Sequence, residues 1–126
     1  MYVSTGKPIV GGSDSSIGQR CNRRQDRQSL AGSLYDILPA DPATVKPAGE
    51  WNTCVIKVKD GKAEHWMNGT KVVEYELWTK EWDEMVAKSK FKNFPGWQEG
   101  IARKGYIGLQ DHGYDVWFRN IKIREL

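Results

Sequence analysis

The sequence predicts an all-β domain, an antiparallel β-sandwich that carries one short helix. Asp60-Gly61 and Asn68-Gly69 are two-residue hairpin turns, and each lies between strand-like runs. Two more strand-like runs flank a polar turn at residues 110–113. Six Trp and 13 Gly also suit a sandwich with tight turns, and 126 residues are enough for one domain.

The first part of the chain predicts few regular elements. Residues 1–30 show no hydrophobic period and are expected to be mostly loop, with residues 1–3 as the tail of a strand. A short apolar segment follows at residues 33–38, anchored by Tyr35 and Leu38. The stretch 39–50 contains three prolines, which favours an extended connection.

An antiparallel meander is predicted next, with strands at 51–59, 63–67 and 70–75 joined by the two hairpin turns. Alternation in the first strand separates two faces, one of which carries Asn52, Cys54, Ile56 and Val58. A meander of this kind is typical of a sandwich sheet.

The hydrophobic period changes to a helical one within residues 78–91. Thr79 is the expected N-cap, and Trp82, Met85 and Val86 fall on one face, which we expect to pack on the sheet. Residues 93–103 are expected to be a loop that carries Trp97.

The last strands are expected around Ile107 and Leu109 and again within residues 116–123. Asn120 shifts the alternation of the second run by one residue, which predicts a β-bulge. The turn between the two runs is polar and ionisable, so it would bring reactive side chains to a sheet edge.

Charge and cysteine content exclude several classes of function. A net charge of +3 is too small to indicate nucleic-acid binding. The arginine-rich stretch 20–27 is read as a solvated loop. The alternatives are a phosphate or nucleic-acid patch, although aromatic residues do not alternate with the arginines, and contact with a sugar hydroxyl or a carboxylate. No signal peptide or membrane span is visible. Cys21 and Cys54 are compatible with one disulfide or with two free thiols, and their spacing gives no zinc motif.

Four separated segments resemble the 3-keto-disaccharide hydrolase domain family, in order and in spacing. They are AGSLYDILPA at 31–40, the meander segments within 47–75, SKF at 89–91, and GLQDHG with FRNIKI within 108–123. The resemblance covers about residues 30–126 and implies a concanavalin A-like (jelly-roll) sandwich without the family's N-terminal strands. It also implies a bacterial protein of the periplasm or the extracellular space.

The resemblance implies action on glycosides that are already oxidised to a ketone at C3. The ketone acidifies the proton at C2, a base removes that proton, the leaving group departs by elimination, and water then adds. This chemistry needs a base, an acid and hydrogen-bond donors to an enolate. The alternatives are a carbohydrate-binding module without catalysis and an inactive fragment that self-associates.

His112 is the first catalytic candidate, because it lies in the polar turn beside Asp111, whose carboxylate would raise its pKa and fix its tautomer. His65 is the second, with a buried, hydrogen-bonded histidine as the alternative reading. Glu50 is a candidate base or a partner for Arg119. The candidates for substrate binding are Gln110, Asn52, Arg119, Trp97 and Tyr35.

The expected ligand is therefore a carbohydrate, with neither nucleic acid nor a membrane span involved. No cofactor is expected, although Asp111 is compatible with a divalent cation. Self-association that completes the sheet is a further expectation, because an incomplete sandwich leaves sheet edges bare.

Overall fold

The computed structural model describes residues 2–7, 30–47, 49–97, 100–109 and 117–126. These residues form one five-stranded antiparallel sheet and one α-helix, which confirms the predicted all-β class with a single helix and is consistent with a concanavalin-like sandwich. None of the described helices is long and apolar enough to cross a membrane. The elements are β1 (Tyr2–Lys7), η1 (Pro42–Thr44), β2 (Asn52–Lys59), β3 (Lys62–Met67), β4 (Thr70–Glu76), α3 (Lys80–Lys88), η2 (Lys90–Asn93) and β5 (Arg119–Arg124).

The predicted meander is confirmed as β2, β3 and β4, which pair in sequence order. Both hairpin turns have positive φ at both central residues. The values are 50° and 86° at Asp60 and Gly61, and 50° and 88° at Asn68 and Gly69. Asn, Asp and Gly tolerate this left-handed backbone better than other residues, so the local sequence sets the register of both hairpins.

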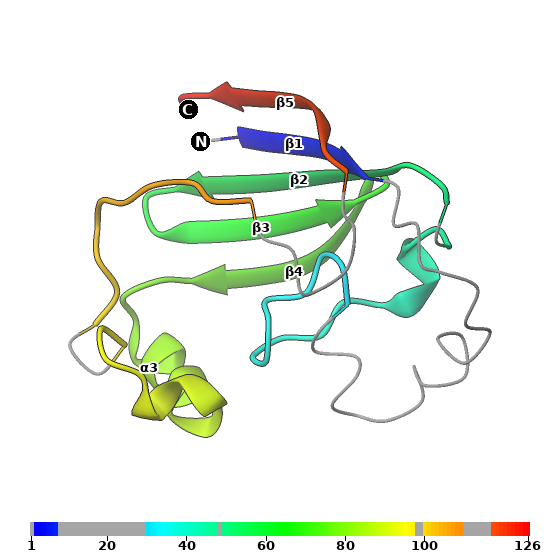
Figure 1. Ribbon diagram of the computed structural model, residues 1–126. Coiled ribbons are helices and arrows are strands. Elements are labelled where there is room, and N and C mark those ends of the chain that lie inside the picture. The colour runs from blue at the N-terminus through cyan, green and yellow to red at the C-terminus, as the bar shows by residue number, and fades with distance from the viewer. Residues whose placement is uncertain (1, 8–29, 48, 98–99, 110–116) are drawn as a thin grey trace.

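The two ends of the chain lie together in the sheet, whose strand order is β4-β3-β2-β1-β5. Figure 1 shows β1 in blue and β5 in red side by side. The strand at the N-terminus extends past Val3 to Lys7, so the expectation of loop was wrong at residues 4–7, while residues 8–29 lie outside the described residues. Backbone pairing with β2 on one side and β5 on the other accounts for this, since it does not require apolar side chains.

The predicted β-bulge is confirmed in β5. Gly6 pairs with Arg119 and Ser4 pairs with Lys122, so two residues of β5 lie opposite one residue of β1. Asn120 has φ of 54° at this point. The bulge changes the side on which the following residues of β5 lie, as the shifted alternation indicated.

The predicted strand around Ile107 and Leu109 is not formed. Residues 105–109 have no strand geometry, and the two side chains are 43% and 49% exposed. Alternation indicates a strand only where a neighbour offers backbone partners. Among the described residues no strand pairs with this segment.

The helix begins where the sequence predicted. Thr79 is the N-cap, and its hydroxyl accepts a hydrogen bond from the Trp82 backbone N–H at 3.2 Å. Trp82 and Val86 are buried as expected, and Met85 is half-buried. The helix ends at Lys88, Ser89 caps it, and the last two residues of the predicted helical stretch, Lys90 and Phe91, belong to η2.

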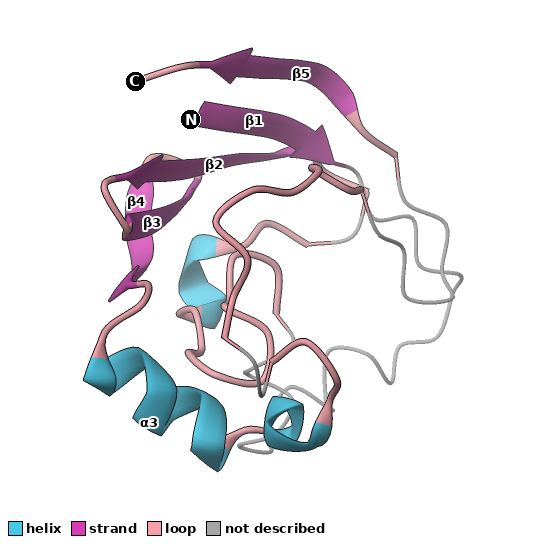
Figure 2. Ribbon diagram, turned by 90° about the vertical axis from the view of Figure 1, so that its left-hand side faces the viewer, coloured by secondary structure: helices cyan, strands magenta, loops and turns pink. Residues whose placement is uncertain are grey.

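Figure 2 shows the described loops on one side of the sheet, with α3 next to β4. Burial on that side alternates along β3, where Ala63, His65 and Met67 are buried while Glu64 and Trp66 are half-buried. Removal of apolar side chains such as those of Ala63 and Met67 from water is the main favourable contribution to the fold. On the opposite face of β2, β3 and β4, the charged side chains of Lys57, Glu64, Lys71 and Glu74 lie close together.

Candidate functional site

His65 lies on the buried side of β3 and is 7% exposed. Its Nδ1 is 2.9 Å from the carbonyl oxygen of Gly32. Its Nε2 is 3.2 Å from the hydroxyl of Tyr75 on the neighbouring strand. Both ring nitrogens therefore have protein partners, which is the alternative reading of this residue that the sequence had left open.

These partners fix the protonation of the imidazole. A carbonyl oxygen can only accept, so Nδ1 carries the hydrogen and donates it to Gly32. Burial lowers the pKa of His65 from 6.5, and the backbone hydrogen bonds offset this in part. The ring is thus neutral at pH 7, and Nε2 accepts the Tyr75 hydroxyl proton. Burial also raises the pKa of Tyr75, so this hydroxyl keeps its proton.

Gly32 can reach His65 because it has no side chain. Its φ is +90°, and a Cβ at this position would lie 3.1 Å from the Met67 Cε and 3.3 Å from the Val72 Cγ2. A side chain here would be strained by the backbone and crowded by the core. The close approach fixes the loop that leads to Tyr35 against the sheet.

Aromatic rings continue from Tyr75 to Phe91 through the helix. Tyr75 and Trp82 are stacked at 5.4 Å between centroids, Trp82 and Trp97 at 6.1 Å, and Trp97 and Phe91 at 4.4 Å. Offset stacking of this kind stabilises each pair beyond the area that it buries. We call Tyr75, Trp82, Trp97 and Phe91 the aromatic column.

Tyr35 lies at the end of the aromatic column and is 38% exposed. The Lys90 ammonium lies 4.0 Å from the centroid of its ring, and the Phe91 ring is 6.4 Å away. The Lys90 backbone N–H donates to the Asp36 carboxylate at 2.8 Å. These contacts join the loop of Tyr35 to η2, so the structure brings Tyr35 and Trp97 into one cluster.

A groove of about 380 Å³ opens beside the aromatic column, between α3 and the residues Lys92, Trp97 and Gly100. It combines two indole rings with one acidic and one basic side chain. Its described lining residues are Trp82, Asp83, Val86, Ala87, Lys92, Trp97 and Gly100.

Asn52 is 4% exposed and serves the fold through its amide. Its Oδ1 accepts from the Lys46 backbone N–H and from Asn68 Nδ2, each at 2.8 Å. Its Nδ2 donates to the Lys46 carbonyl at 3.2 Å. The amide joins the start of β2 to the loop before it and to the second hairpin turn.

Glu50 and Arg119 are both exposed, and the described ion pairs include no contact between them. Instead, the Arg119 guanidinium stacks on the Trp51 ring, with its central carbon 3.8 Å from the ring centroid. A cation–π contact at an exposed site contributes about 0.5–1 kcal/mol. Arg119 thus contacts Trp51 and not Glu50, which the sequence had suggested as its partner.

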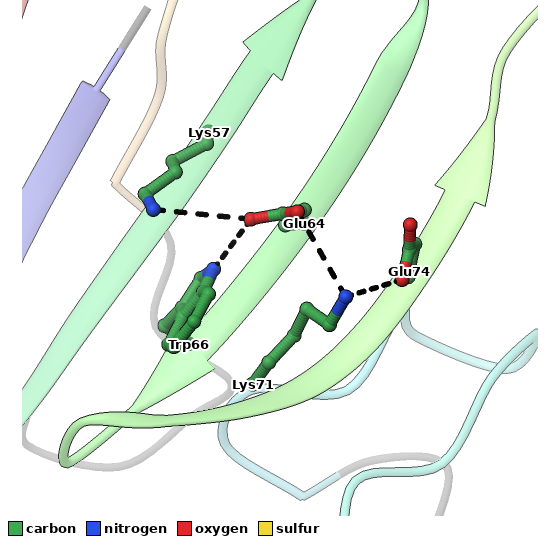
Figure 3. Close-up of polar contacts among 5 residues, drawn as sticks. All are labelled: Lys57, Glu64, Trp66, Lys71 and Glu74. Carbon is green, nitrogen blue, oxygen red and sulfur yellow. Dashed lines mark hydrogen bonds and ion pairs between the residues drawn. The ribbon is translucent and has the colours of Figure 1, made fainter.

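A charged network covers the outer face of the sheet, as Figure 3 shows. The Glu64 carboxylate accepts from the Trp66 indole N–H at 2.7 Å. It also lies 3.9 Å from the ammonium groups of Lys57 and Lys71, and Lys71 pairs in turn with Glu74. The Lys57 ammonium is 4.5 Å from the centroid of the Trp66 ring. We call these five residues the outer-face network.

The polar turn with Gln110, Asp111 and His112 lies outside the described residues. Cys21 lies outside them as well, while Cys54 is half-buried and its thiol pKa is raised by burial. Within the ranges that the structure describes, no three His, Cys, Asp or Glu side chains gather closely enough to hold a metal ion.

Sequence reasoning had missed Tyr75 and the groove. Tyr75 alternates with Val73 along β4, which signals an inward position, but its contact with His65 depends on how β4 pairs with β3. The groove joins Asp83 to Lys92 and Trp97, whose closeness depends on the turn after the helix. A helical face with Trp82 beside Asp83 was the available signal.

Comparison with known proteins shows the family to which the chain is similar. A model of the "3-keto-alpha-glucoside-1,2-lyase-like domain" matches residues 4–124. A 3-keto-disaccharide hydrolase from Bacteroides thetaiotaomicron is 40% identical over the whole chain. The chain spans 46% of the length of that relative.

The fold is similar to solved structures as well. Two proteins from Parabacteroides distasonis, provisionally named glycosyl hydrolases, align with TM-scores of 0.75 and 0.60, each at 21% identity. The alignments cover 95% and 99% of this chain, and 69% and 77% of the respective neighbours. At this level of identity the likeness shows the fold.

Proposed function

This chain belongs to the 3-keto-alpha-glucoside-1,2-lyase-like domain family, and from that premise we propose that it acts on 3-keto-glycosides as a carbohydrate hydrolase or lyase. The observation that carries the proposal is the 40% identity to a 3-keto-disaccharide hydrolase over the whole length of this chain. Since the chain spans 46% of that relative, the activity of the relative is a proposal for this chain.

The reaction that we propose proceeds by elimination and hydration. A base takes the C2 proton, electrons move into the C3 carbonyl to give an enolate, and then expel the glycosidic oxygen from C1. That oxygen takes a proton from an acid. Water then adds at C1 and a proton returns to C2, so the glycosidic bond is hydrolysed with no net oxidation.

We assign the acid or base role to His112, with Asp111 as the residue that orients it and Gln110 as a donor to the enolate oxygen. Glu50 is an exposed carboxylate and is our second candidate base. His65 is buried and bonded at both nitrogens, which supports a positioning role through Gly32 and Tyr75 rather than contact with substrate. A divalent cation at Asp111 is compatible with this scheme.

The test is turnover of methyl 3-keto-α-glucoside, followed by release of methanol, in the chain and in two variants. His112→Gln is expected to lower kcat by about 100-fold or more, because it removes proton transfer but keeps a polar side chain. Glu84→Gln, an exposed helix residue near Lys80, is the control and is expected to keep the activity. Equal activity of His112→Gln and the parent chain would overturn the assigned role.

Measurements on the parent chain alone distinguish an enzyme from a carbohydrate-binding module without catalysis. Binding of methyl α-glucoside without any methanol release from the oxidised glycoside would support the module and contradict the enzyme.

Self-association remains a second proposal, carried by exposed apolar side chains near the C-terminus. Tyr106, Trp117, Ile121 and Ile123 are 106%, 43%, 45% and 61% exposed. Such a surface favours pairing of a further chain next to β5. A molar mass from light scattering tests this, since a stable monomer would contradict it.

We also propose that the protein works in the bacterial periplasm or outside the cell, because this is the location that membership of its family implies. Detection of the protein in the cytoplasmic fraction alone, after cell fractionation, would contradict that location.

A further inference from the structure

We propose that the groove between α3 and the segment carrying Lys92, Trp97 and Gly100 binds a pyranose ring of the carbohydrate substrate. The groove measures about 380 Å³, which lies near the lower end of the range for small-molecule sites and suits a single ring. None of its charged lining residues takes part in the reaction proposed above.

The walls supply an apolar surface of fixed position. Phe91 covers one side of the Trp97 ring at 4.4 Å, with an angle of 13° between the planes. Trp97 also stacks on Trp82, at 6.1 Å and 22°, and both indoles line the groove. The parts of the two indoles that line the groove offer an apolar contact to the C–H groups of a pyranose ring.

The rim supplies polar partners from two short elements. Asp83 stands in the first turn of α3, where its backbone N–H donates to the Thr79 carbonyl at 3.1 Å. Lys92 stands on η2, whose first turn is capped by Ser89. A carboxylate accepts hydrogen bonds from sugar hydroxyls and an ammonium donates them, so the pair recognises both functions of a hydroxyl group.

The same pair argues against a purely apolar ligand. Such a ligand would strip water from Asp83 and Lys92 without replacing its hydrogen bonds, which is costly for charged groups. A ring with one apolar face and hydroxyls at its edge avoids this cost. The combination of indole, carboxylate and ammonium therefore favours a sugar over a purely apolar ligand.

The choice of a sugar as ligand rests on the proposed function, but the test measures binding and requires no turnover. The ¹⁵N-labelled chain is titrated with methyl α-glucopyranoside while the indole N–H signals of its six Trp residues are followed by NMR. We expect the signals of Trp82 and Trp97 to shift. Failure of turnover with retained shifts would overturn the enzyme proposal alone.

Two variants locate the contact. Asp83→Asn keeps the size of the side chain and its place on the helix. It should weaken binding about tenfold, because one hydrogen bond to a charged group is lost. Lys92→Gln is expected to weaken it in the same direction. Glu81→Gln is the matched control, because Glu81 is also an exposed acid in the first turn but does not line the groove.

Three results would overturn the inference. One is a shift confined to other indoles, such as those of Trp51 or Trp66. Another is unchanged affinity in both Asp83→Asn and Lys92→Gln when circular dichroism shows them folded. The third is binding of p-nitrophenol at Trp82 and Trp97 with no response to the glycoside, which would indicate an apolar ligand.

Discussion

The Tyr75 hydroxyl is 3.2 Å from Nε2 of His65, and the two rings meet edge to face with an angle of 82°. The contact joins β3 to β4 inside the core and begins the aromatic column that ends at Phe91. A buried histidine with two partners thus connects the loop of Gly32 to the meander. The fold depends on this connection in ways that stability measurements can detect.

Tyr75→Phe is expected to lower the free energy of unfolding by about 1–2 kcal/mol. The substitution keeps the stacked ring but leaves Nε2 of His65 buried without a donor. Urea unfolding followed by fluorescence measures the change. Tyr106→Phe is the control, because Tyr106 is fully exposed, and it should leave stability unchanged. Equal stability of Tyr75→Phe and the parent chain would contradict the hydrogen bond.

Stability is expected to fall as the pH drops below about 6.5, the ordinary pKa of histidine. Burial lowers the pKa of His65 in the folded state, so the unfolded chain binds more protons between the two pKa values. The neutral His65 thus contributes its full stabilisation above pH 6.5. This stabilisation is lost as the pH falls from 6.5 through the pKa of His65 in the folded state. Urea unfolding at a series of pH values measures it.

The same titration has an internal control in the second histidine. NMR of the imidazole C–H signals should give a pKa below 6.5 for His65, and His112→Gln should keep the pH dependence of stability. If the pH dependence of stability disappeared in His112→Gln, it would arise from His112 and not from His65.

Gly32→Ala is expected to destabilise the fold by more than Gly49→Ala does. Both glycines have positive φ, +90° and +93°, so both substitutions carry a backbone cost of about 1–2 kcal/mol. The Gly32 variant also places a methyl group 3.1 Å from the Met67 Cε, whereas the Gly49 position is open. The difference between the two unfolding free energies isolates the packing contribution, and a difference of zero would contradict the close approach.

The features that the sequence predicted correctly are local ones. Asp60-Gly61 and Asn68-Gly69 determine their own turns through backbone preference, and Thr79 determines the helix start through its hydroxyl. The bulge at Asn120 was visible as a change of period within one strand. Each of these requires information from only a few neighbouring residues.

The features that sequence reasoning missed depend on distant contacts. The pairing of β1 with β5 joins the two ends of the chain, and no local pattern near Val3 or Ile123 specifies the partner. The bond from His65 to Gly32 spans 33 residues. The groove requires α3 and the segment of Trp97 to fold back on each other. Such contacts follow from the packing of the whole core.

Glu64→Gln is expected to destabilise the protein by about 0.5–1 kcal/mol at low salt. The substitution keeps an oxygen that can accept from the Trp66 indole but removes the charge that lies 3.9 Å from Lys57 and Lys71. Since this side chain is 30% exposed, salt screens the interaction, and the difference should shrink in 1 M NaCl. Chemical unfolding by urea, which is uncharged, measures both conditions.

Glu74→Gln is the matched control for the outer-face network. Glu74 pairs with Lys71 but is 58% exposed and accepts no indole hydrogen bond in the described contacts, so its loss should matter less than that of Glu64. Glu64 is bordered by two ammonium groups and one indole, and therefore organises the cluster that Glu74 merely extends. Equal effects of the two substitutions, or an effect of Glu64→Gln that salt leaves unchanged, would show that charge at the centre of this face does not stabilise the sheet.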